Sequence, residues 1–394
     1  MIKKTILQYF TLTMLFNFAM CSIVATYVTF LTSNGLNLFE VNMVNFVFFS
    51  VRLIFEIPTG AFADVFGRKA SFVMSCLLMS LGTFMYALSH SFWGFAAAEG
   101  VSAVGSTFAS GAFDAWLVDK LNHHGHTGER HRIFARAEFL GRVVGIASAL
   151  IGSYLADIRG SLPWFLGSAI FLVTGIVTIC WMKEEYFEKQ PFSWSLGLTS
   201  MKNTFLSSVE YGIKNKVVRF IVIVGLIQMF AVQAPNMQWQ PYFIQFVHAK
   251  RNLGYMWVVM SSFLMIGSMI APRLLTRVKD EKKSLVICQV IAGLGILLTT
   301  LVPFLAGIMI YMVHEIPRGM YGPLKKKYLH DNIPSKERAT IASFESISPH
   351  LGGMAGLLLS GFLANTYSIS LAWVTSGVVL IGATLLVAKN GVKK

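Results

Sequence analysis

Long, uninterrupted runs of apolar residues alternate with short polar segments along the whole chain. A helix that spans a bilayer needs about 20 mostly apolar residues. Because the runs are continuous and do not alternate in polarity, they predict membrane-spanning helices and not the strands of a barrel. Twelve such runs lie at approximately 7–31, 41–60, 70–90, 92–118, 134–156, 162–182, 217–247, 253–275, 284–303, 304–329, 338–364 and 368–388.

The composition agrees with this pattern. Of the 394 residues, 55% are hydrophobic and 13% are charged, whereas a soluble domain carries about 25% charged residues. This balance excludes a soluble enzyme, a disordered chain and a collagen-like repeat. The cysteines all lie inside apolar runs, which predicts buried free thiols and neither disulfides nor a metal site. They are Cys21, Cys76, Cys180 and Cys288.

The basic residues are unevenly distributed. The chain carries 33 Lys and Arg against 19 acidic residues, a net charge of +14. If the N-terminus is cytoplasmic, 27 of these basic residues lie on the cytoplasmic side and 3 outside. Cytoplasmic loops of membrane proteins carry such an excess, so we expect a multi-pass protein of the cell membrane with both termini inside. The basic side then faces anionic lipid, and no nucleic-acid partner is predicted.

A long polar stretch divides the chain into two similar halves. We expect an N-terminal six-helix bundle at 1–183, a cytoplasmic linker at 184–216 and a C-terminal six-helix bundle at 217–394. Gly145 has a counterpart 207 residues later in Gly352. Six-span halves related by an axis along the membrane normal are typical of transporters, with the substrate site at the midplane between them.

One motif points to a family. The segment between the second and third runs reads Gly60-Ala-Phe-Ala-Asp64-Val-Phe-Gly67-Arg68-Lys69. It resembles the major facilitator superfamily signature G-x-L-x-D-x-x-G-R-[KR], with Phe62 in place of Leu. The resemblance covers essentially the whole chain. It implies a fold of 12 transmembrane helices in two six-helix bundles with pseudo-twofold symmetry, and alternating-access transport of a small molecule. It also implies no enzymatic activity and no cofactor.

The motif suggests a gate. Its glycines suit a tight turn, and Asp64 suits the N-terminus of a neighbouring helix. Arg68 offers a planar fork for a carboxylate, for which Asp114 is the first candidate and Asp119 the second. In the proteins that the chain resembles, such contacts latch the halves in the outward-facing state. The alternative is that these charges only enforce topology.

Charged residues inside the predicted spans are candidates for proton coupling. A charge at the bilayer centre costs about 2.5–3.5 kcal/mol on insertion scales, so such residues are functional candidates by default. Together with a neighbouring histidine they are Arg52, Glu56, Glu99, Arg142, His314, Glu315 and Arg318.

Several of these charges have a structural alternative. Arg52 and Glu56 are four residues apart and can neutralise each other, and Glu315 and Arg318 can pair at a spacing of three. Glu99 stands where the drug/proton antiporters of the superfamily carry an arginine. A buried carboxylate there can carry a proton, unless Arg142 is its partner.

Two alternatives are open for His314, which lies close to Pro317, an expected kink. It can relay protons, or it can be a packed, neutral side chain.

Amides and aromatic residues in the seventh run suit a cavity for amphipathic molecules. The candidates are Gln228, Gln233, Asn236 and Trp239, with Asn17 in the first run as a weaker counterpart. The alternative is interhelical amide bonding with an aromatic belt. The cluster His123-His124-Gly125-His126 lacks the ligand spacing of a metal site, and we expect a solvated loop and no metal.

The chain also resembles, in part, one branch of the family. Gly141 and Gly145 match the span 5 element of the drug/proton antiporters, with Ile146 where that element has proline. We therefore expect a monomer that exports hydrophobic or amphipathic compounds, including drugs and antibiotics, driven by the proton gradient. Alternatives are a proton-coupled symporter that imports a small nutrient and a lipid-translocating member of the superfamily.

Overall fold

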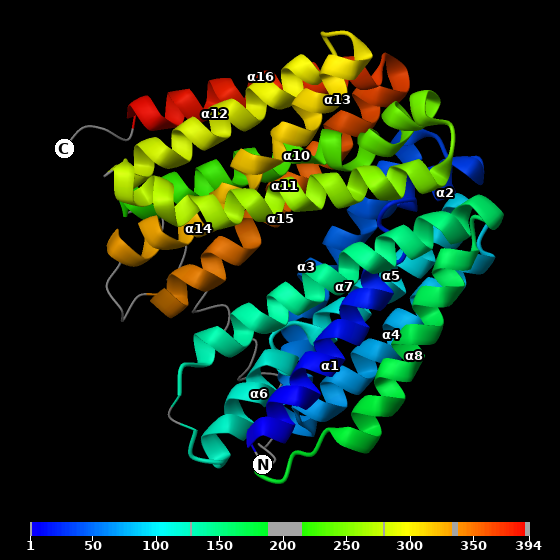
Figure 1. Cartoon of the computed structure of the whole chain (residues 1–394), viewed down its shortest axis with the longest axis vertical. Coiled ribbons are helices and arrows are strands. Elements are labelled where there is room, and N and C mark those ends of the chain that lie inside the picture. Colours follow the sequence, from blue (N-terminus) through cyan, green and yellow to red (C-terminus); the bar gives the residue numbers. More distant parts are fainter. Residues whose placement is uncertain (1, 127, 188–214, 279, 333–337, 391–394) are drawn as a thin grey trace. The chain divides into compact units, whose positions relative to one another are not determined.

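The computed structural model describes residues 2–126, 128–187, 215–278, 280–332 and 338–390, and the secondary structure within these ranges is helical (Figure 1). The first helices are α1 Ile2–Cys21, α2 Tyr27–Ser33, α3 Leu38–Phe66, α4 Arg68–Leu88, α5 Phe92–Ala109, α6 Ala112–His123, α7 Arg130–Ile158 and α8 Leu162–Trp181. They are followed by α10 Lys216–Val247, α11 Lys250–Arg277, α12 Glu281–Thr299, α13 Phe304–Val313, α14 Glu315–Asn332, α15 Arg338–Thr366 and α16 Ile369–Asn390.

The chain divides into two compact units. The described residues of unit 1 lie within 1–36, 44–193 and 243–258, and those of unit 2 within 37–43, 194–242 and 259–394. Of the linker predicted at 184–216, residues 188–214 lie outside the described part of the chain.

Several helices begin at side chains that cap them. Asn37 and Glu40 form a reciprocal capping box at the start of α3, in which each side chain accepts from the other's backbone N–H at 2.9 Å. The Asp280 carboxylate accepts from the backbone N–H of Lys283 at 2.9 Å at the start of α12. Such caps satisfy N–H groups that have no partner within the helix, and they set where these helices begin.

Eight helices in the described part of the chain are long and apolar enough to cross a membrane. They are α3, α4, α7, α8, α10, α12 and α16 together with residues 250–274 of α11. The runs at 7–31, 92–118 and 304–329 are instead divided into pairs of shorter helices, and the run at 338–364 lies in α15. The predicted all-helical membrane fold is confirmed, while the count of twelve spans stays a prediction.

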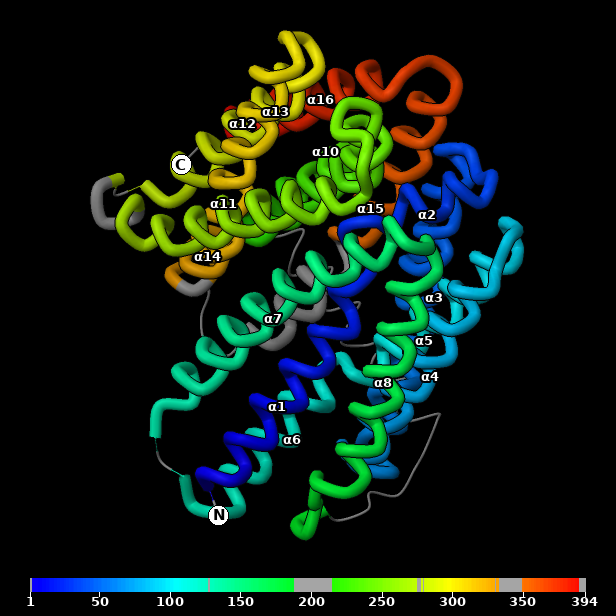
Figure 2. The backbone as a smooth tube through the Cα atoms, turned by 45° about the vertical axis from the view of Figure 1, so that its right-hand side comes forward, coloured from blue at the N-terminus to red at the C-terminus, as the bar shows by residue number. Residues whose placement is uncertain are grey.

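Small residues bring pairs of helices together in both units. In unit 1, α1 runs alongside α7 (Figure 2), where a Cβ on Gly152 would collide with the Ser22 carbonyl. In unit 2, a Cβ on Gly352 or on Gly356 would collide with backbone carbonyls of α10. Because dispersion contacts drive helix packing in lipid, these glycines explain the close α1–α7 and α10–α15 pairs.

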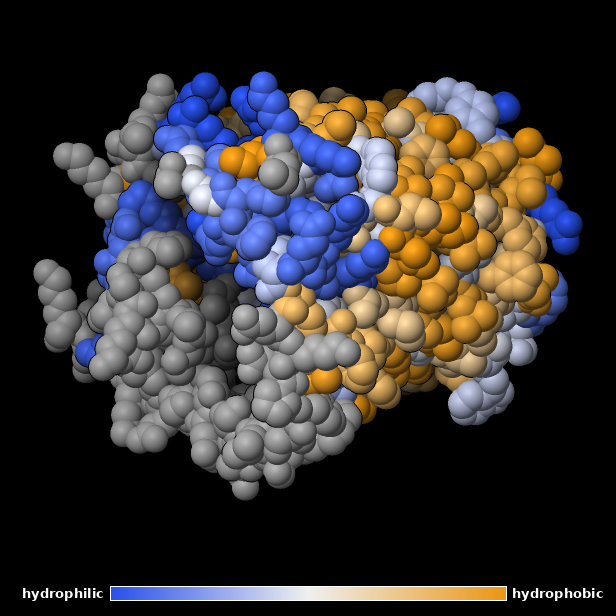
Figure 3. Space-filling view, turned by 90° about the horizontal axis from the view of Figure 1, so that it is seen from below, coloured by the Kyte–Doolittle hydropathy of each residue, from blue (hydrophilic) through white to orange (hydrophobic). Residues whose placement is uncertain are grey.

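Each unit has an apolar core and apolar outer surfaces. Phe72, Trp116 and Leu117 lie in the core of unit 1, and Ile221, Leu285 and Leu324 in that of unit 2. Exposed apolar side chains recur on the outer face of α4 at Leu77, Leu81, Phe84 and Leu88. Figure 3 shows hydrophobic side chains forming a continuous area on one face of the molecule. Such a surface suits contact with lipid.

The cysteines differ from their predicted burial. All four are free thiols, but only Cys76 and Cys288 are buried, whereas Cys21 is half-buried and Cys180 is exposed. The prediction of burial was wrong for Cys180, because an apolar run in a membrane protein also supplies the side chains on the outer face of a helix.

Candidate functional site

The motif Gly60–Lys69 covers the end of α3, the turn at Gly67 and the start of α4. Gly67 has a φ of +96°, in the left-handed region that glycine adopts without strain. Phe62, which stands where the signature has leucine, stacks on Phe66 with ring centroids 4.5 Å apart. Asp64 and Arg68 form an ion pair of 2.9 Å across this turn. The aromatic replacement therefore keeps an apolar contact at this position.

The carboxylates proposed as partners of Arg68 lie elsewhere. Asp114 accepts a hydrogen bond of 2.5 Å from the Tyr9 hydroxyl. Asp119 lines a cavity of about 700 Å³ together with Asp64 and Arg68. The structure therefore pairs Arg68 within its own turn and not with Asp114. Asp64, four residues before Arg68, is the closer carboxylate, and Asp114 instead accepts from Tyr9 on α1.

The last residue of the motif contacts the end of another helix. Lys69 donates from Nζ to the backbone carbonyl of Ile179 at 2.8 Å, in the last turn of α8. Glu184, which follows α8, accepts from the backbone N–H groups of Arg68 at 2.7 Å and of Lys69 at 3.1 Å. The sequence analysis missed Glu184, because nothing in the spacing of the motif points to a residue over 100 positions away.

Among the described residues of unit 1, one carboxylate is buried, and it lies close to aromatic side chains. Glu99, on α5, is 7% exposed and accepts a hydrogen bond from the hydroxyl of Tyr86, on α4. The Tyr86 hydroxyl lies 3.3 Å from that of Tyr27, which the Asn45 amide contacts at 3.5 Å. The Trp164 ring stacks on Tyr86 with centroids 4.1 Å apart. Among the described residues, no cation forms an ion pair with Glu99.

Arg142 is not the partner of Glu99. It pairs with Glu138, four residues earlier on α7, at 2.7 Å, and both side chains are exposed. Arg52 and Glu56 on α3 approach to 3.6 Å, and Glu56 also accepts from the Ser110 hydroxyl at 2.7 Å. The structural alternative for Arg52 and Glu56 is thus present in the structure.

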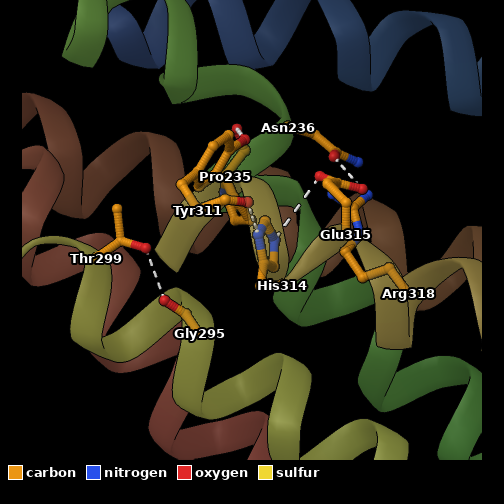
Figure 4. A network of polar contacts seen from close by, with 8 residues as sticks. All are labelled: Pro235, Asn236, Gly295, Thr299, Tyr311, His314, Glu315 and Arg318. Atoms are coloured by element: carbon orange, nitrogen blue, oxygen red, sulfur yellow. Dashed lines mark hydrogen bonds and ion pairs between the residues drawn. The ribbon is translucent and has the colours of Figure 1, made fainter. Parts of the chain in front are cut away.

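Unit 2 holds a larger polar network, drawn in Figure 4. Arg318 donates to the Glu315 carboxylate at 2.6 Å and to the Asn236 amide oxygen at 2.8 Å. His314 and Glu315 are each 2% exposed, and His314 Nε2 lies 3.8 Å from a Glu315 carboxylate oxygen. His314 Nδ1 contacts the Tyr311 carbonyl; since a carbonyl only accepts, Nδ1 carries the hydrogen.

A break between α13 and α14 places this network. α13 ends at Val313 and α14 begins at Glu315, so His314 stands at the junction. Gly295 on α12 leaves room for the His314 side chain, which a Cβ at that position would meet. Pro317 lies in the first turn of α14, where its missing N–H removes no helical hydrogen bond. The sequence thus favours a loosened helix where the ionisable groups converge.

The predicted cavity residues fall into different environments. Gln233 and Trp239 are 3% and 2% exposed within unit 2, whereas Asn236 is exposed and Gln228 is half-buried. Asn17, in unit 1, donates to the Thr13 carbonyl of its own helix at 2.8 Å. Asn236 joins the charged network through its hydrogen bond with Arg318.

No group of three or more His, Cys, Asp and Glu residues that could hold a metal ion occurs in the described ranges. The His123 ring instead lies 5.6 Å from that of Tyr186.

Comparison with known proteins identifies the family. The model of the Major Facilitator Superfamily matches residues 10–313 and 251–390. The chain belongs to the major facilitator superfamily. It is therefore a multi-pass membrane transporter of a class that binds small molecules, needs no cofactor and in general is not enzymatic.

Individual relatives agree with this membership. The chain is 22% identical over 363 residues to "Uncharacterized MFS-type transporter YxaM" of Bacillus subtilis (strain 168), covering 90% of this chain and 88% of the relative. A mutant of the nucleoside transporter NupG matches with a TM-score of 0.79 and 13% identity over 98% of each chain. A POT family transporter in complex with a peptide conjugate matches with a TM-score of 0.74 and 12% identity, covering 98% of this chain and 96% of the other. At these identities the solved structures establish the superfamily fold and not a substrate.

Proposed function

We propose that this transporter exports amphipathic small molecules in exchange for protons. The observation that carries the proposal is Glu99, a carboxylate 7% exposed in unit 1 whose hydrogen-bond donor is a tyrosine and not a cation. An ionised carboxylate buried without a counter-charge is far less stable than the neutral acid. Glu99 therefore carries a proton in this conformation, and it releases that proton when alternation brings water to the side chain.

The cargo side of the proposal rests on unit 2. The Asn236 side chain is exposed, and its oxygen already accepts from Arg318. The groups left for a cargo at this position are therefore the N–H donors of Asn236 and Arg318. Donors of this kind suit a carbonyl, carboxylate or sulfonate oxygen on the cargo. Apolar and aromatic parts of an amphipathic cargo would bind the surrounding side chains. This arrangement supports our proposal that the chain belongs to the drug/proton antiporter branch of the superfamily.

Gating and topology complete the proposal. Alternation is the movement of two six-helix bundles, at 1–183 and 217–394, around the cargo site. The gating motif, with its Asp64–Arg68 pair, lies on the cytoplasmic side, where we also place both termini and where basic side chains meet anionic lipid. One copy of the chain carries all the groups that this mechanism uses, so we propose a monomer.

Everted membrane vesicles from cells that express the protein test the proposal. The probes are ethidium, rhodamine 6G and carboxyfluorescein, two cationic dyes and one anionic dye. We expect an imposed pH gradient to drive the accumulation of at least one dye, and an uncoupler to abolish it. Glu99→Gln removes the proton site. Dye accumulation in vesicles with this variant should fall to the level of vesicles without the protein.

The matched control is Glu138→Gln. It makes the same chemical change at an exposed carboxylate that is paired with Arg142, and it should accumulate dye like the unaltered protein. Proton-driven accumulation by Glu99→Gln at the unaltered rate would contradict the proton site. Failure of all three dyes, together with proton-dependent uptake of a nutrient by whole cells, would instead support the symporter.

A further inference from the structure

Helix α4 begins without a side-chain cap of its own. Its N-cap position is Gly67, which has no side chain to accept from the first N–H groups of the helix. These groups have no partner within the helix, and leaving them buried and unpaired is costly. By contrast, α5 and α12 begin at Ser91 and Asp280, whose side chains accept from backbone N–H groups.

Glu184 supplies the missing cap from a distant part of the chain. One carboxylate oxygen accepts from the Arg68 N–H at 2.7 Å and the other from the Lys69 N–H at 3.1 Å. The carboxylate fills the space where a Cβ on residue 67 would stand, with Oε2 2.5 Å from that position. An anion at the positive end of a helix is also favoured by the helix dipole.

The contact is reciprocal. Lys69 donates to the Ile179 carbonyl at 2.8 Å, so a cation of the motif lies at the C-terminal end of α8. Glu184 follows α8 and lies at the N-terminal end of α4. Each helix end thus receives the charge that stabilises it, and each charge comes from the partner segment. Neither partner alone would fix both ends.

The residues around Glu184 hold it in place. The Lys183 carbonyl accepts from Trp116 Nε1 at 3.2 Å and from Lys120 Nζ at 2.9 Å. The Tyr186 hydroxyl donates to the Trp116 carbonyl at 3.2 Å. Burial, followed by the charges of the nearby Glu184 and Asp119 carboxylates, raises the pKa of Tyr186 above its usual value. Residues 183–186 are therefore anchored to α6 on both sides of Glu184.

We infer that Glu184 is a positioning residue for the gating motif: its carboxylate fixes the backbone of Gly67, Arg68 and Lys69, and with Lys69 it joins the start of α4 to the end of α8. The inference rests on the proposed gate. It extends that gate to a residue outside the motif, at the point where the chain leaves α8 for the other half. The turn that presents Arg68 to Asp64 is then set by Glu184.

Hydrogen–deuterium exchange of the purified protein in detergent tests the contact without any cargo. In Glu184→Gln the acceptor loses its charge, and the amides of Arg68 and Lys69 should exchange about tenfold faster, as for the loss of a charge-assisted hydrogen bond. Glu185→Gln is the matched control, because Glu185 makes only a 3.9 Å contact with Lys183 and is well exposed. Equal exchange in the two variants would overturn the inference.

Transport separates positioning from a general structural role. With the dye that the vesicles accumulate, Glu184→Gln should lower the maximal rate per folded protein and leave the half-saturating dye concentration unchanged. Glu184→Asp keeps the charge and should restore part of the rate. A rate loss matched by an equal loss of folded protein, or a Glu184→Asp variant as slow as Glu184→Gln, would overturn the inference.

The glycines of the motif offer a second pair of variants. Gly67→Ala should open the same amides to exchange, because its Cβ meets the Glu184 carboxylate and its φ is +96°. Gly60→Ala meets nothing within 4 Å and should leave exchange unchanged. Unaltered exchange in Gly67→Ala would count against the inference. If no dye is transported at all, the proposed function fails while these exchange results still decide the contact.

Discussion

Among the described residues, each unit of this transporter has one buried carboxylate, and the two carboxylates have different partners. Glu99 in unit 1 is 7% exposed and accepts from the Tyr86 hydroxyl. Glu315 in unit 2 is 2% exposed and accepts from the Arg318 guanidinium at 2.6 Å. The two side chains are similarly buried, so they differ mainly in the partner that each has.

This difference separates the two carboxylates by function. Glu315 forms an ion pair with the Arg318 guanidinium, and this pair holds Arg318 in place beside Asn236. A hydroxyl does not compensate a full charge, so Glu99 is stable as a neutral acid. We infer that unit 1 carries the exchangeable proton, and that unit 2 carries a fixed ion pair that orients donors toward the cargo.

The largest effect should come from breaking the ion pair of unit 2. Arg318→Gln leaves Glu315 buried without a counter-charge, which costs about 3–5 kcal/mol in the free energy of unfolding. Reversible unfolding of the purified protein in mixed micelles measures this loss. Arg142→Gln is the control: it breaks the exposed pair with Glu138, and such pairs contribute about 0–1 kcal/mol. Similar losses in the two variants would show that the burial of Glu315 does not matter.

A smaller loss is expected from Tyr86→Phe in unit 1. It removes the donor to Glu99 and one contact of the Tyr27 hydroxyl, and a buried group left unpaired costs about 1–3 kcal/mol. The same unfolding experiment checks this value. Tyr27→Phe leaves the Tyr86–Glu99 contact intact and should cost less. A larger loss in Tyr27→Phe than in Tyr86→Phe would mean that the network is centred on Tyr27 and not on Glu99.

Contacts within one helix were readable from the sequence, and contacts between helices were not. The pairs Arg52–Glu56 and Glu315–Arg318 follow from spacings of four and three, which place two side chains on one helix face. The expected pairs Arg68–Asp114 and Glu99–Arg142 instead depend on how one helix is rotated against another. The hydropathy pattern does not encode that rotation. Arg68 pairs with Asp64 and Arg142 with Glu138, each four residues earlier in the chain.

Helix breaks were also hidden from the hydropathy pattern. The runs at 7–31 and 92–118 are continuous in sequence, but the helices within them end at Cys21 and Ala109. Polar groups near the first break find partners locally: the Ser22 hydroxyl donates to the Ala19 carbonyl at 2.8 Å. A break of this kind leaves no signature in mean hydropathy, because the residues that satisfy it are small and only mildly polar.

The partners of two site residues gave no signal that the sequence analysis could use. Tyr86 lies in an apolar run with no pattern that marks it, and Glu184 is the first residue of the predicted cytoplasmic linker. Tyr86 on α4 contacts Glu99 on α5, and Glu184, which follows α8, contacts the start of α4. The family motif predicted which turn belongs to the proposed gate. The residues that contact this turn are set by the packing of the helices and could be identified only from the structure.

Asn236→Ala should have a modest effect. It removes the 2.8 Å hydrogen bond to Arg318, but the amide is exposed and water can replace it, so the expected loss is about 0.5–1 kcal/mol. Unfolding in micelles measures this loss, and dye accumulation checks the cargo role separately. Transport should fall more than stability does, because Asn236 presents a donor to the cargo. A variant with unaltered transport would remove Asn236 from the cargo site and leave it as a neighbour of the ion pair.

The smallest effect on stability is expected from Glu99→Gln, the variant with the largest effect on coupling. Glutamine is neutral and close in shape to a protonated glutamate, and its oxygen can accept from Tyr86 as before. The change in the free energy of unfolding should therefore stay below about 1 kcal/mol. Glu315→Gln makes the same substitution in unit 2, where it leaves Arg318 without its anion, and it should cost more. If Glu99→Gln were the more damaging of the two, Glu99 would be ionised in the folded protein, and the proton would have to be carried elsewhere.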